Sequence, residues 1–305
     1  MEMNRFNFTK IIILQSIDPS DSSLFSVGEA LKKSIDSSLS TLIANDYSFK
    51  GFTCDITHIN GFASWDSFWN ELEKSCNTGC KPIIHFVCHG DTRDNMYIWN
   101  NTDYQPIAYS QVYEHLRKVN MLTRNNVFVT MCVCHGYSSL IHLFKDETIV
   151  PFCGIVATPN EIYSYDARIR YKDFYYKLLT TQNLTEAHNI IQQDAKQVAL
   201  SLKDKTADIY TEFSDELFMK AFKGAVSSHY TPNKSENTAL NSILEDSRSH
   251  GMSDEEILEL VEEYKRLCLN SMDTIYRNIR DKKFMLDKYP DERSRYTFPD
   301  SVKDL

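Results

Sequence analysis

Hydrophobic residues along the chain follow two alternating patterns. Short apolar runs, typical of buried strands, fall at residues 10–17, 51–59, 81–90, 127–132 and 150–158. Helical spacing covers residues 25–43, 64–75, 108–120 and about 165–202, and residues 96–101 (MYIWNN) have the pattern of one hairpin arm. Ser64 is the expected N-cap of the second helix. This alternation predicts βαβ units, and therefore an α/β fold with a mostly parallel sheet flanked by helices on both faces.

The last quarter of the chain has a different pattern. Residues 227–238 are polar, contain Pro232 and predict a linker. Beyond them only helical spacing occurs, and Ser253 with Glu256 predicts a capping box. We therefore expect a main domain over 1–230 and a helical extension over 239–305, whose helices span 239–286 and end in a loose tail. One face of the extension either packs on the main domain or docks a partner; it carries Ile257, Leu260, Val261, Tyr264, Leu267 and Cys268.

The charge balance and the lengths of the apolar runs argue against nucleic-acid-binding and membrane proteins. The chain has 33 Lys and Arg against 42 Asp and Glu, a net charge of −9. Nucleic-acid surfaces need clustered cations, so direct nucleic-acid binding is not expected. The apolar run near the N-terminus is too short for a signal peptide, and no later run reaches the roughly 18 residues that span a membrane. We expect a cytoplasmic protein that does not enter membranes.

The spacing of the cysteines does not indicate a metal site. The eight cysteines should be reduced in a cytosol. Cys76, Cys80 and Cys88 lie near His85 and His89, but this spacing is not a standard zinc pattern and part of it falls inside a buried strand. We expect no metal and no other cofactor, with Cys54 and Cys88 as core residues.

Two strand-like runs end in the same triplet, Cys-His-Gly: IIHFVCHG at 83–90 and VFVTMCVCHG at 127–136. In open α/β sheets, ligands bind beyond the carboxyl ends of the strands. Neighbouring strands lie about 5 Å apart, so His89 and Cys132 can approach each other there. Gly90 would let the chain turn sharply and expose the imidazole. A thiol beside an imidazole is the arrangement of nucleophilic catalysis, although each residue alone is more often a solvated or core side chain.

The ordered set of segments resembles the core of a CHAT domain, a group of caspase-related (clan CD) cysteine peptidases. The similarity rests on the strand that closes in His-Gly (85–90), the hairpin arm, the helix at 108–120 and the strand at 127–132. It continues through CGIVATPNE (153–161) and DFYYKLLTTQNLTEAHNIIQQ (173–193), so it covers about residues 80–200. The resemblance implies that the main domain is a caspase-like CHAT peptidase domain.

The resemblance also implies roles for individual residues. His89 would be the general base, Cys132 the nucleophile, and the backbone amides of Gly90 and Cys132 the oxyanion hole. Residues 133–136 depart from the family, which has polar or small residues there. Cys134 is an alternative nucleophile, because strand alternation puts it on the same side as Cys132; the register of the motif favours Cys132.

Two further histidines have simpler interpretations. We expect His135 to cap the following helix or to face solvent. We expect His85, inside its strand, to be a buried and hydrogen-bonded core residue.

Charged residues near the two corners bear on specificity. In this group of peptidases, acidic residues in the pocket select Arg or Lys at P1, the residue preceding the cleaved bond, and basic residues select Asp. The acidic candidates are Asp91, Asp94, Glu161 and Asp166, and the basic ones are Arg93, Arg168 and Arg170. The acidic set lies closer to the corners in the sequence, which favours a basic P1 residue and a pocket that includes Asp91, Glu161 and Asp166.

The resemblance further implies a protein substrate and a biological context. Related stand-alone prokaryotic peptidases serve as regulated effectors in anti-phage defence, in CRISPR-associated or gasdermin-type systems, and wait for a regulatory protein partner. The helical extension is a natural docking segment for it. The alternative is a catalytically inactive caspase-like scaffold or adaptor. A hydrolase with a G-x-S-x-G elbow or a thiol oxidoreductase with C-x-x-C is disfavoured, since neither motif occurs.

Overall fold

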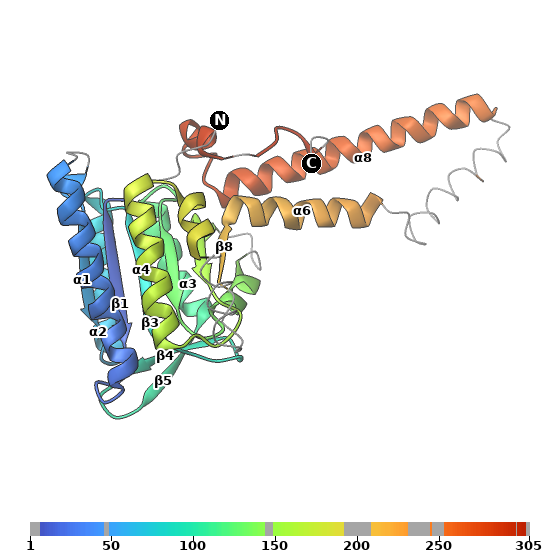
Figure 1. Ribbon diagram of the computed structural model, residues 1–305. Helices are drawn as coiled ribbons and strands as arrows, with labels where there is room; N and C mark the ends of the chain where they lie inside the picture. Colours follow the sequence, from blue (N-terminus) through green and yellow to red (C-terminus); the bar gives the residue numbers. More distant parts are fainter. Residues whose placement is uncertain are drawn as a thin grey trace. The chain divides into compact units, whose positions relative to one another are not determined.

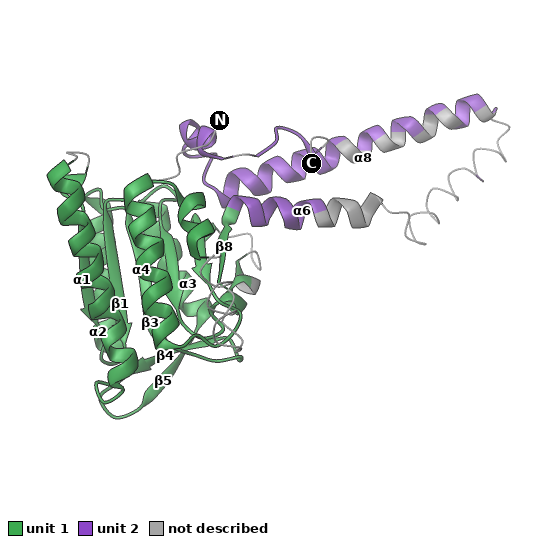
Figure 2. Ribbon diagram, in the orientation of Figure 1, with its two compact units in different colours: residues 1–214 green, residues 215–305 purple. Residues whose placement is uncertain are grey.

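The computed structural model describes residues 7–45, 49–143, 149–191, 209–230, 245, 253–296 and 298–302 (Figure 1). The chain forms two compact units, residues 1–214 and 215–305 (Figure 2). None of the described helices is long and apolar enough to cross a membrane.

The first unit is built on one mixed, mostly parallel sheet. Its strand order is β2-β1-β3-β6-β7-β8, and all neighbours are parallel except the last pair. The bounds are β1 Lys10–Ser16, β2 Thr53–His58, β3 Pro82–Gly90, β6 Phe128–Cys132, β7 Gly154–Ala157 and β8 Tyr210–Phe213. A hairpin of β4 (Asn95–Trp99) and β5 (Tyr104–Ala108) extends β3 through antiparallel pairing. The α/β prediction is confirmed, and β8 is a strand that the sequence did not predict.

Helices cover both faces of this sheet (Figure 1). One face carries α1 (Ser22–Asn45) and α4 (Ser164–Thr181), which pack on each other; the opposite face carries α2 (Gly61–Asn77) and α3 (Tyr109–Leu122). Between the sheet and the first helix pair lies an apolar core that includes Ile13, Ile83, Leu31, Ile35 and Phe174. Burial of each such side chain stabilises the fold by about 1.5–3 kcal/mol, so this core fixes the strands whose ends form the site.

The start of α2 corrects one prediction. The helix begins at Gly61 and its N-cap is Asn60, which makes no side-chain cap. The Ser64 hydroxyl lies inside the first turn, where it accepts from the Asn60 amide at 2.8 Å and donates to the Gly61 carbonyl at 2.9 Å. Ser64 therefore satisfies the first turn from within rather than from the N-cap position.

The second unit is helical and begins earlier than expected. It contains most of α6 (Ser214–Tyr230), then α8 (Asp254–Lys283) and a short 3-10 helix, η3 (Pro290–Arg295). Phe218 of α6 has ring contacts with Tyr276, Phe284 and Phe298 at 5.6–6.0 Å. This aromatic cluster explains why the division falls at 214/215 rather than at 230. Residues 227–230 of the predicted linker belong to α6, and the rest of it lies outside the described residues.

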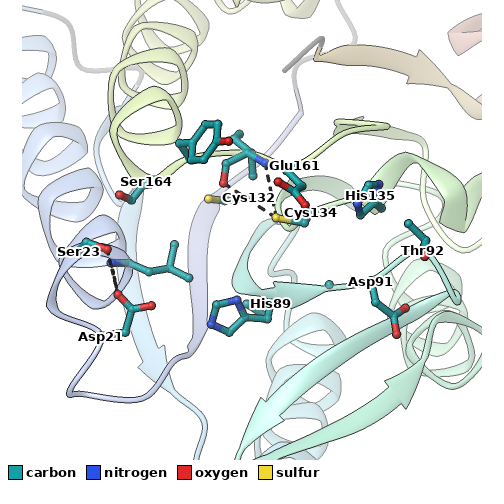
Figure 3. Close-up of a pocket in the computed structure, with 15 residues that line it drawn as sticks. Asp21, Ser23, His89, Asp91, Thr92, Cys132, Cys134, His135, Glu161 and Ser164 are labelled. Atoms are coloured by element: carbon teal, nitrogen blue, oxygen red, sulfur yellow. Dashed lines mark hydrogen bonds between the residues drawn. The ribbon is translucent and has the colours of Figure 1, made fainter. Parts of the chain in front are cut away.

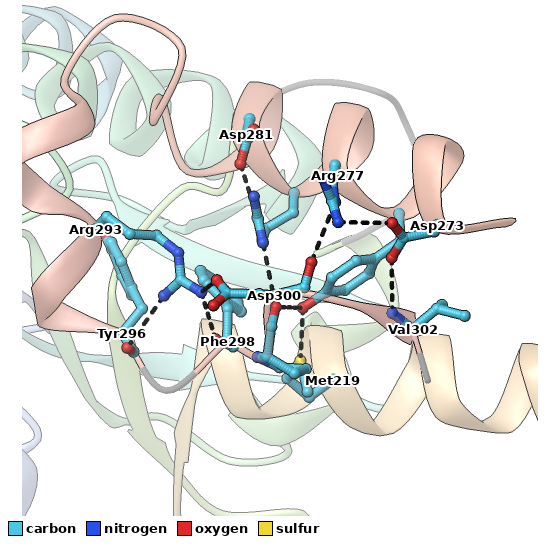
Figure 4. Close-up of polar contacts among 12 residues, drawn as sticks. Met219, Asp273, Arg277, Asp281, Arg293, Tyr296, Phe298, Asp300 and Val302 are labelled. Atoms are coloured by element: carbon cyan, nitrogen blue, oxygen red, sulfur yellow. Dashed lines mark hydrogen bonds and ion pairs between the residues drawn. The ribbon is translucent and has the colours of Figure 1, made fainter. Parts of the chain in front are cut away.

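The described end of the chain is not a loose tail. Phe298 and Val302 are buried. Arg280 Nη1 donates to the Pro299 carbonyl at 3.2 Å, and the Val302 amide donates to Asp273 Oδ1 at 2.9 Å (Figure 4). Polar contacts to α8 thus hold the segment, and the loose-tail prediction is wrong for these residues.

The long helix α8 begins as predicted. Ser253 and Glu256 form a reciprocal capping box, with the Glu256 amide 3.3 Å from Ser253 Oγ. On the predicted apolar face, Ile257 is buried and Leu267 is 54% exposed. The side chains of Leu260, Val261, Tyr264 and Cys268 lie outside the described residues. The face is therefore not covered along its whole length.

Candidate active site

The parallel pairing of β3 with β6 brings the two Cys-His-Gly corners to one edge of the sheet. Val87 is opposite Cys132 in the register, so His89 extends two residues beyond it. Both corners line one pocket of about 500 Å³. The start of α1 and the loop that leads into α4 complete its walls, so its lining comes from segments 21–24, 88–92, 132–135 and 161–164 (Figure 3). The expected edge site is present as a hollow.

The His89 imidazole enters the pocket from the end of β3. Its ring packs edge-on against Tyr104 of β5, with centroids 4.7 Å apart. Partial burial lowers the pKa of His89 below its usual value of 6.5, and the nearby Asp21 carboxylate opposes this shift. Among the described residues neither ring nitrogen has a hydrogen-bond partner. A neutral imidazole with a free nitrogen can accept a proton.

The Cys132 thiol belongs to the inner wall of the pocket. Cys132 is the last residue of β6, is 1% exposed and is part of the apolar core. Burial raises its pKa far above the usual value, and the nearby Cys134 and Cys88 add to the shift. Its thiolate is therefore strongly disfavoured in this state.

The Cys134 thiol lies just beyond the strand end and is only partly buried. Its sulfur accepts the Ile162 amide at 3.5 Å. Burial raises its pKa, but the bond to the Ile162 backbone favours the thiolate and works against that shift. Figure 3 shows the His89 ring on one side of the pocket and the sulfurs of Cys132 and Cys134 on the other. Both candidate nucleophiles thus face the candidate base.

Gly90 has a role different from the predicted sharp turn. It continues β3 and pairs with Met96 of the hairpin. A Cβ at this position would lie 2.3 Å from the Cys134 carbonyl oxygen and 2.6 Å from Val133 Cγ1. Only glycine allows the two backbones to approach this closely. The glycine therefore brings the His89 corner into contact with the Cys134 corner.

The other two histidines are accounted for by hydrogen bonding. His85 is fully buried; its Nδ1 lies 2.7 Å from Thr130 Oγ1, and burial lowers its pKa to about 3. The prediction of a core histidine is confirmed. His135 occupies the N-cap position of η2 (Gly136–His142) but makes no cap. Its Nδ1 donates to the Pro159 carbonyl at 2.9 Å, which directs the ring away from a capping role.

The predicted acidic residues divide into those that line the pocket and those that do not. Asp91 and Glu161 line it. Asp91 is already engaged, because its carboxylate accepts the Tyr97 hydroxyl at 2.7 Å and the Arg93 amide at 2.8 Å. Asp166 is buried in the first turn of α4 and is not among the lining residues, and neither is Asp94. Two of the three residues predicted for a substrate pocket therefore line this hollow, and Asp166 does not.

Sequence reasoning missed Asp21. This residue precedes α1, lines the pocket and accepts the Leu24 amide at 3.2 Å. Its only sequence signal was that of an ordinary N-cap. Among the described residues, no Lys or Arg lines the pocket. Of the basic candidates, Arg170 is buried and donates to the Ile191 carbonyl. All lining residues that carry a fixed charge are acidic.

The described cysteines other than Cys132 and Cys134 are candidate metal ligands or core residues by their sequence. Within the described part of the chain, no three His, Cys, Asp or Glu side chains are grouped so as to hold an ion. Cys54 and Cys88 are buried, as predicted.

Comparison with known proteins adds no assignment: no protein-family model matches the chain, and a search of curated proteins finds no match. The functional argument therefore depends on the geometry of the site.

Proposed function

We propose that the chain is a caspase-like cysteine endopeptidase of the CHAT type, with His89 as its general base. The observation that carries this proposal is the shared pocket at the carboxyl ends of β3 and β6, with an imidazole facing two thiols. The motif order along the chain, strand to His-Gly, hairpin, helix, then strand to Cys, supports it.

Cys134 is the better nucleophile of the two cysteines. The motif register favours Cys132, but that thiol is almost fully buried in the apolar core. Cys134 is more exposed, and its sulfur already accepts a backbone N–H that stabilises negative charge. Its backbone also touches Gly90, next to the base. Cys132 remains the alternative nucleophile.

The electrostatics favour a thiol and a neutral imidazole over a preformed ion pair. Burial raises the pKa of Cys134 and lowers that of His89. In the proposed reaction His89 takes the thiol proton as Cys134 Sγ attacks the scissile carbonyl carbon. His89 then protonates the leaving amine, and water, deprotonated by His89, hydrolyses the thioester and restores the thiol.

The oxyanion of this reaction needs backbone donors beside the nucleophile. With Cys134 as nucleophile, the amides of Gly90 and Cys134 are the candidates, because these two backbones are in contact. With Cys132 as nucleophile, the pair would be Gly90 and Cys132.

The pocket favours a cationic P1 side chain. Asp21 and Glu161 line it, and no described Lys or Arg does. Asp91 contributes less, because its carboxylate already accepts several hydrogen bonds. A guanidinium or ammonium group would therefore meet complementary charge.

A pair of activity-based probes tests the proposal. Peptidyl acyloxymethyl ketones with Arg or Asp at P1 are incubated with the full chain, and the labelled residue is mapped by mass spectrometry. We expect the Arg probe to label Cys134, and His89→Ala to abolish labelling. Labelling by the Asp probe alone would refute the basic preference. No labelling by either probe in the presence of the activating partner would favour the inactive scaffold.

The wider context stays a prediction. A role as a regulated effector in anti-phage defence and a regulatory protein partner follow from the resemblance. The helical extension as its docking segment also draws on the apolar face of that extension, and the cytoplasmic location follows from the short apolar runs of the sequence.

A further inference from the structure

A second hollow, separate from the proposed active site, lies between α1 and α4. Its volume is about 620 Å³, and it shares no lining residue with the first pocket. The two helices run side by side on one face of the sheet (Figure 1). Small-molecule sites typically have volumes of about 300–1,000 Å³, so this hollow, here called the α1–α4 groove, is large enough for a ligand.

Residues at helical spacing line each wall of the α1–α4 groove. On α1 they recur at steps of three and four, and the same holds on α4. The α1 wall consists of Ala30, Lys33, Ser34, Ser37 and Ser38, and the α4 wall of Tyr165, Arg168, Ile169 and Lys172. These stripes flank the buried faces of the helices, so the lining follows from the fold and not from a chance loop conformation.

The charge of the groove is entirely positive. Lys33, Arg168 and Lys172 line it, and within the described part of the chain no acidic residue does. None of the three cations has an ion-pair partner among the described residues. The two acidic residues of α1 next to the groove, Glu29 and Asp36, lie against His58 and Lys32 instead. Three uncompensated cations in one hollow of a chain with net charge −9 indicate an anionic ligand.

Hydroxyl groups add directional hydrogen bonding to this charge. Ser34, Ser37 and Ser38 lie along the same wall as Lys33. Ser38 Oγ donates to the Ser34 carbonyl at 3.0 Å, which leaves the other two hydroxyls for a ligand. Arg and Lys with Ser hydroxyls are the side chains that bind phosphate oxygens.

An apolar platform distinguishes this groove from a site for phosphate alone. Tyr165 lines the groove and is 65% exposed, and Ala30 and Ile169 are half-buried beside it. An exposed aromatic ring next to cations can stack a nucleobase while the cations hold its phosphates. We propose that the α1–α4 groove binds a nucleotide.

Calorimetry with the full chain tests whether the positive charge of the groove binds an anion. ATP and tripolyphosphate are titrated without divalent cations at about 50 and 200 mM salt. We expect saturable ATP binding with a Kd below about 1 mM, within reach of a few charge-assisted hydrogen bonds, and weaker binding at the higher salt. Arg168→Ala should weaken binding about tenfold, which equals the loss of one such bond.

The matched control is Lys118→Ala. Lys118 is exposed on α3, on the opposite face of the sheet, so the substitution removes one cation from outside the groove. The affinity of the Lys118→Ala variant for ATP should stay within about twofold of that of the wild type. Absence of saturable ATP binding, or equal effects of Arg168→Ala and Lys118→Ala, would overturn the site.

A second variant tests whether the groove binds the nucleobase. Tyr165→Ala should weaken ATP binding about fivefold, through lost stacking, and leave tripolyphosphate binding unchanged. Tyr165 is exposed, so the variant should fold. If the change affects both probes alike, or neither, the nucleotide assignment is wrong.

Discussion

The interior of the sheet and its carboxyl edge hold the same two residue types in different states. His85 and Cys132 lie inside the strands; His85 is hydrogen-bonded to Thr130 with a pKa of about 3, and Cys132 is 1% exposed. His89 and Cys134, four and two residues further along, face an open pocket and are only partly buried. Residue type alone therefore does not distinguish the proposed reactive pair from the buried one; the position of each residue relative to its strand end does.

Burial shifts the pKa values of the inner pair (His85 and Cys132) and of the edge pair (His89 and Cys134) in the same directions, but to different extents. It lowers the pKa of each imidazole and raises that of each thiol. His85 lines neither the active-site pocket nor the α1–α4 groove, and Cys132 reaches the active-site pocket only at its inner wall, with 1% of its surface exposed. At the edge the shift favours the neutral imidazole, the form that the proposed general base requires, and both side chains line the pocket.

Replacing the two thiols separately should have the largest effect. We expect Cys134→Ala to lower peptidase activity by about 10³-fold or more, since a nucleophile is lost. Cys132→Ala should retain activity within about tenfold and lower the free energy of unfolding by about 1 kcal/mol, because a buried sulfur is removed. Hydrolysis of Arg peptides and urea unfolding measure the two effects. The reverse pattern of activities would make Cys132 the nucleophile.

Two glycine replacements separate the edge from the interior. In Gly90→Ala the new methyl group would meet the Cys134 carbonyl, and in Gly154→Ala it would meet the rings of Phe128 and Phe213. We expect Gly90→Ala to lower activity by about 10²-fold through displacement of the site. Gly154→Ala should instead lower the stability by about 1–3 kcal/mol and leave the activity of the folded fraction unchanged.

The control is to measure the activity and the free energy of unfolding of both glycine variants. If Gly90→Ala retains full activity, the contact between the two corners does not position the site.

The alkylation rates of the two thiols can be compared without a substrate, and we expect a smaller difference than for the substitutions. Iodoacetamide should modify Cys134 about tenfold faster than Cys132 in the native protein, because the inner thiol is both inaccessible and held protonated. In urea the two rates should converge. Mass spectrometry of digested samples measures both. Equal native rates would show that the interior is open and would weaken the comparison.

Most of the fold was predictable because short apolar runs and longer stretches of helical spacing distinguish strands from helices. The runs at 10–17 and 127–132 became β1 and β6, and the capping box at Ser253 formed as expected. The edge strand β8 was missed because only four residues form it, and its pairing with β7 comes from a segment far along the chain.

The site was predictable only in part, for a physical reason. A motif names His89 and two cysteines, but strand alternation cannot say which sulfur leaves the core. Gly90 was expected to turn and instead allows close backbone contact. Asp21 is far from the motif in sequence, so only the folded chain brings it to His89.

Asp21→Asn should have the smallest effect and the most specific one. The carboxylate raises the pKa of His89, so its removal should lower that pKa further. Activity requires the neutral imidazole and falls as the pH drops through this pKa, below 6.5. The acid limb of kcat/KM for the variant should therefore move to lower pH. Asn can still accept the Leu24 amide, so the cap of α1 should persist.

The same variant tests the charge preference with a matched pair of substrates. Peptides with Arg or the neutral isostere citrulline at P1 are compared at pH 8, where His89 is deprotonated in both proteins. We expect kcat/KM for Arg to fall about three- to tenfold, the loss of one partly screened ion pair, and the value for citrulline to stay constant. An unchanged ratio would remove Asp21 from substrate recognition. A shifted acid limb with an unchanged ratio would leave the carboxylate acting on His89 alone, as a neighbour of the base and not of the substrate.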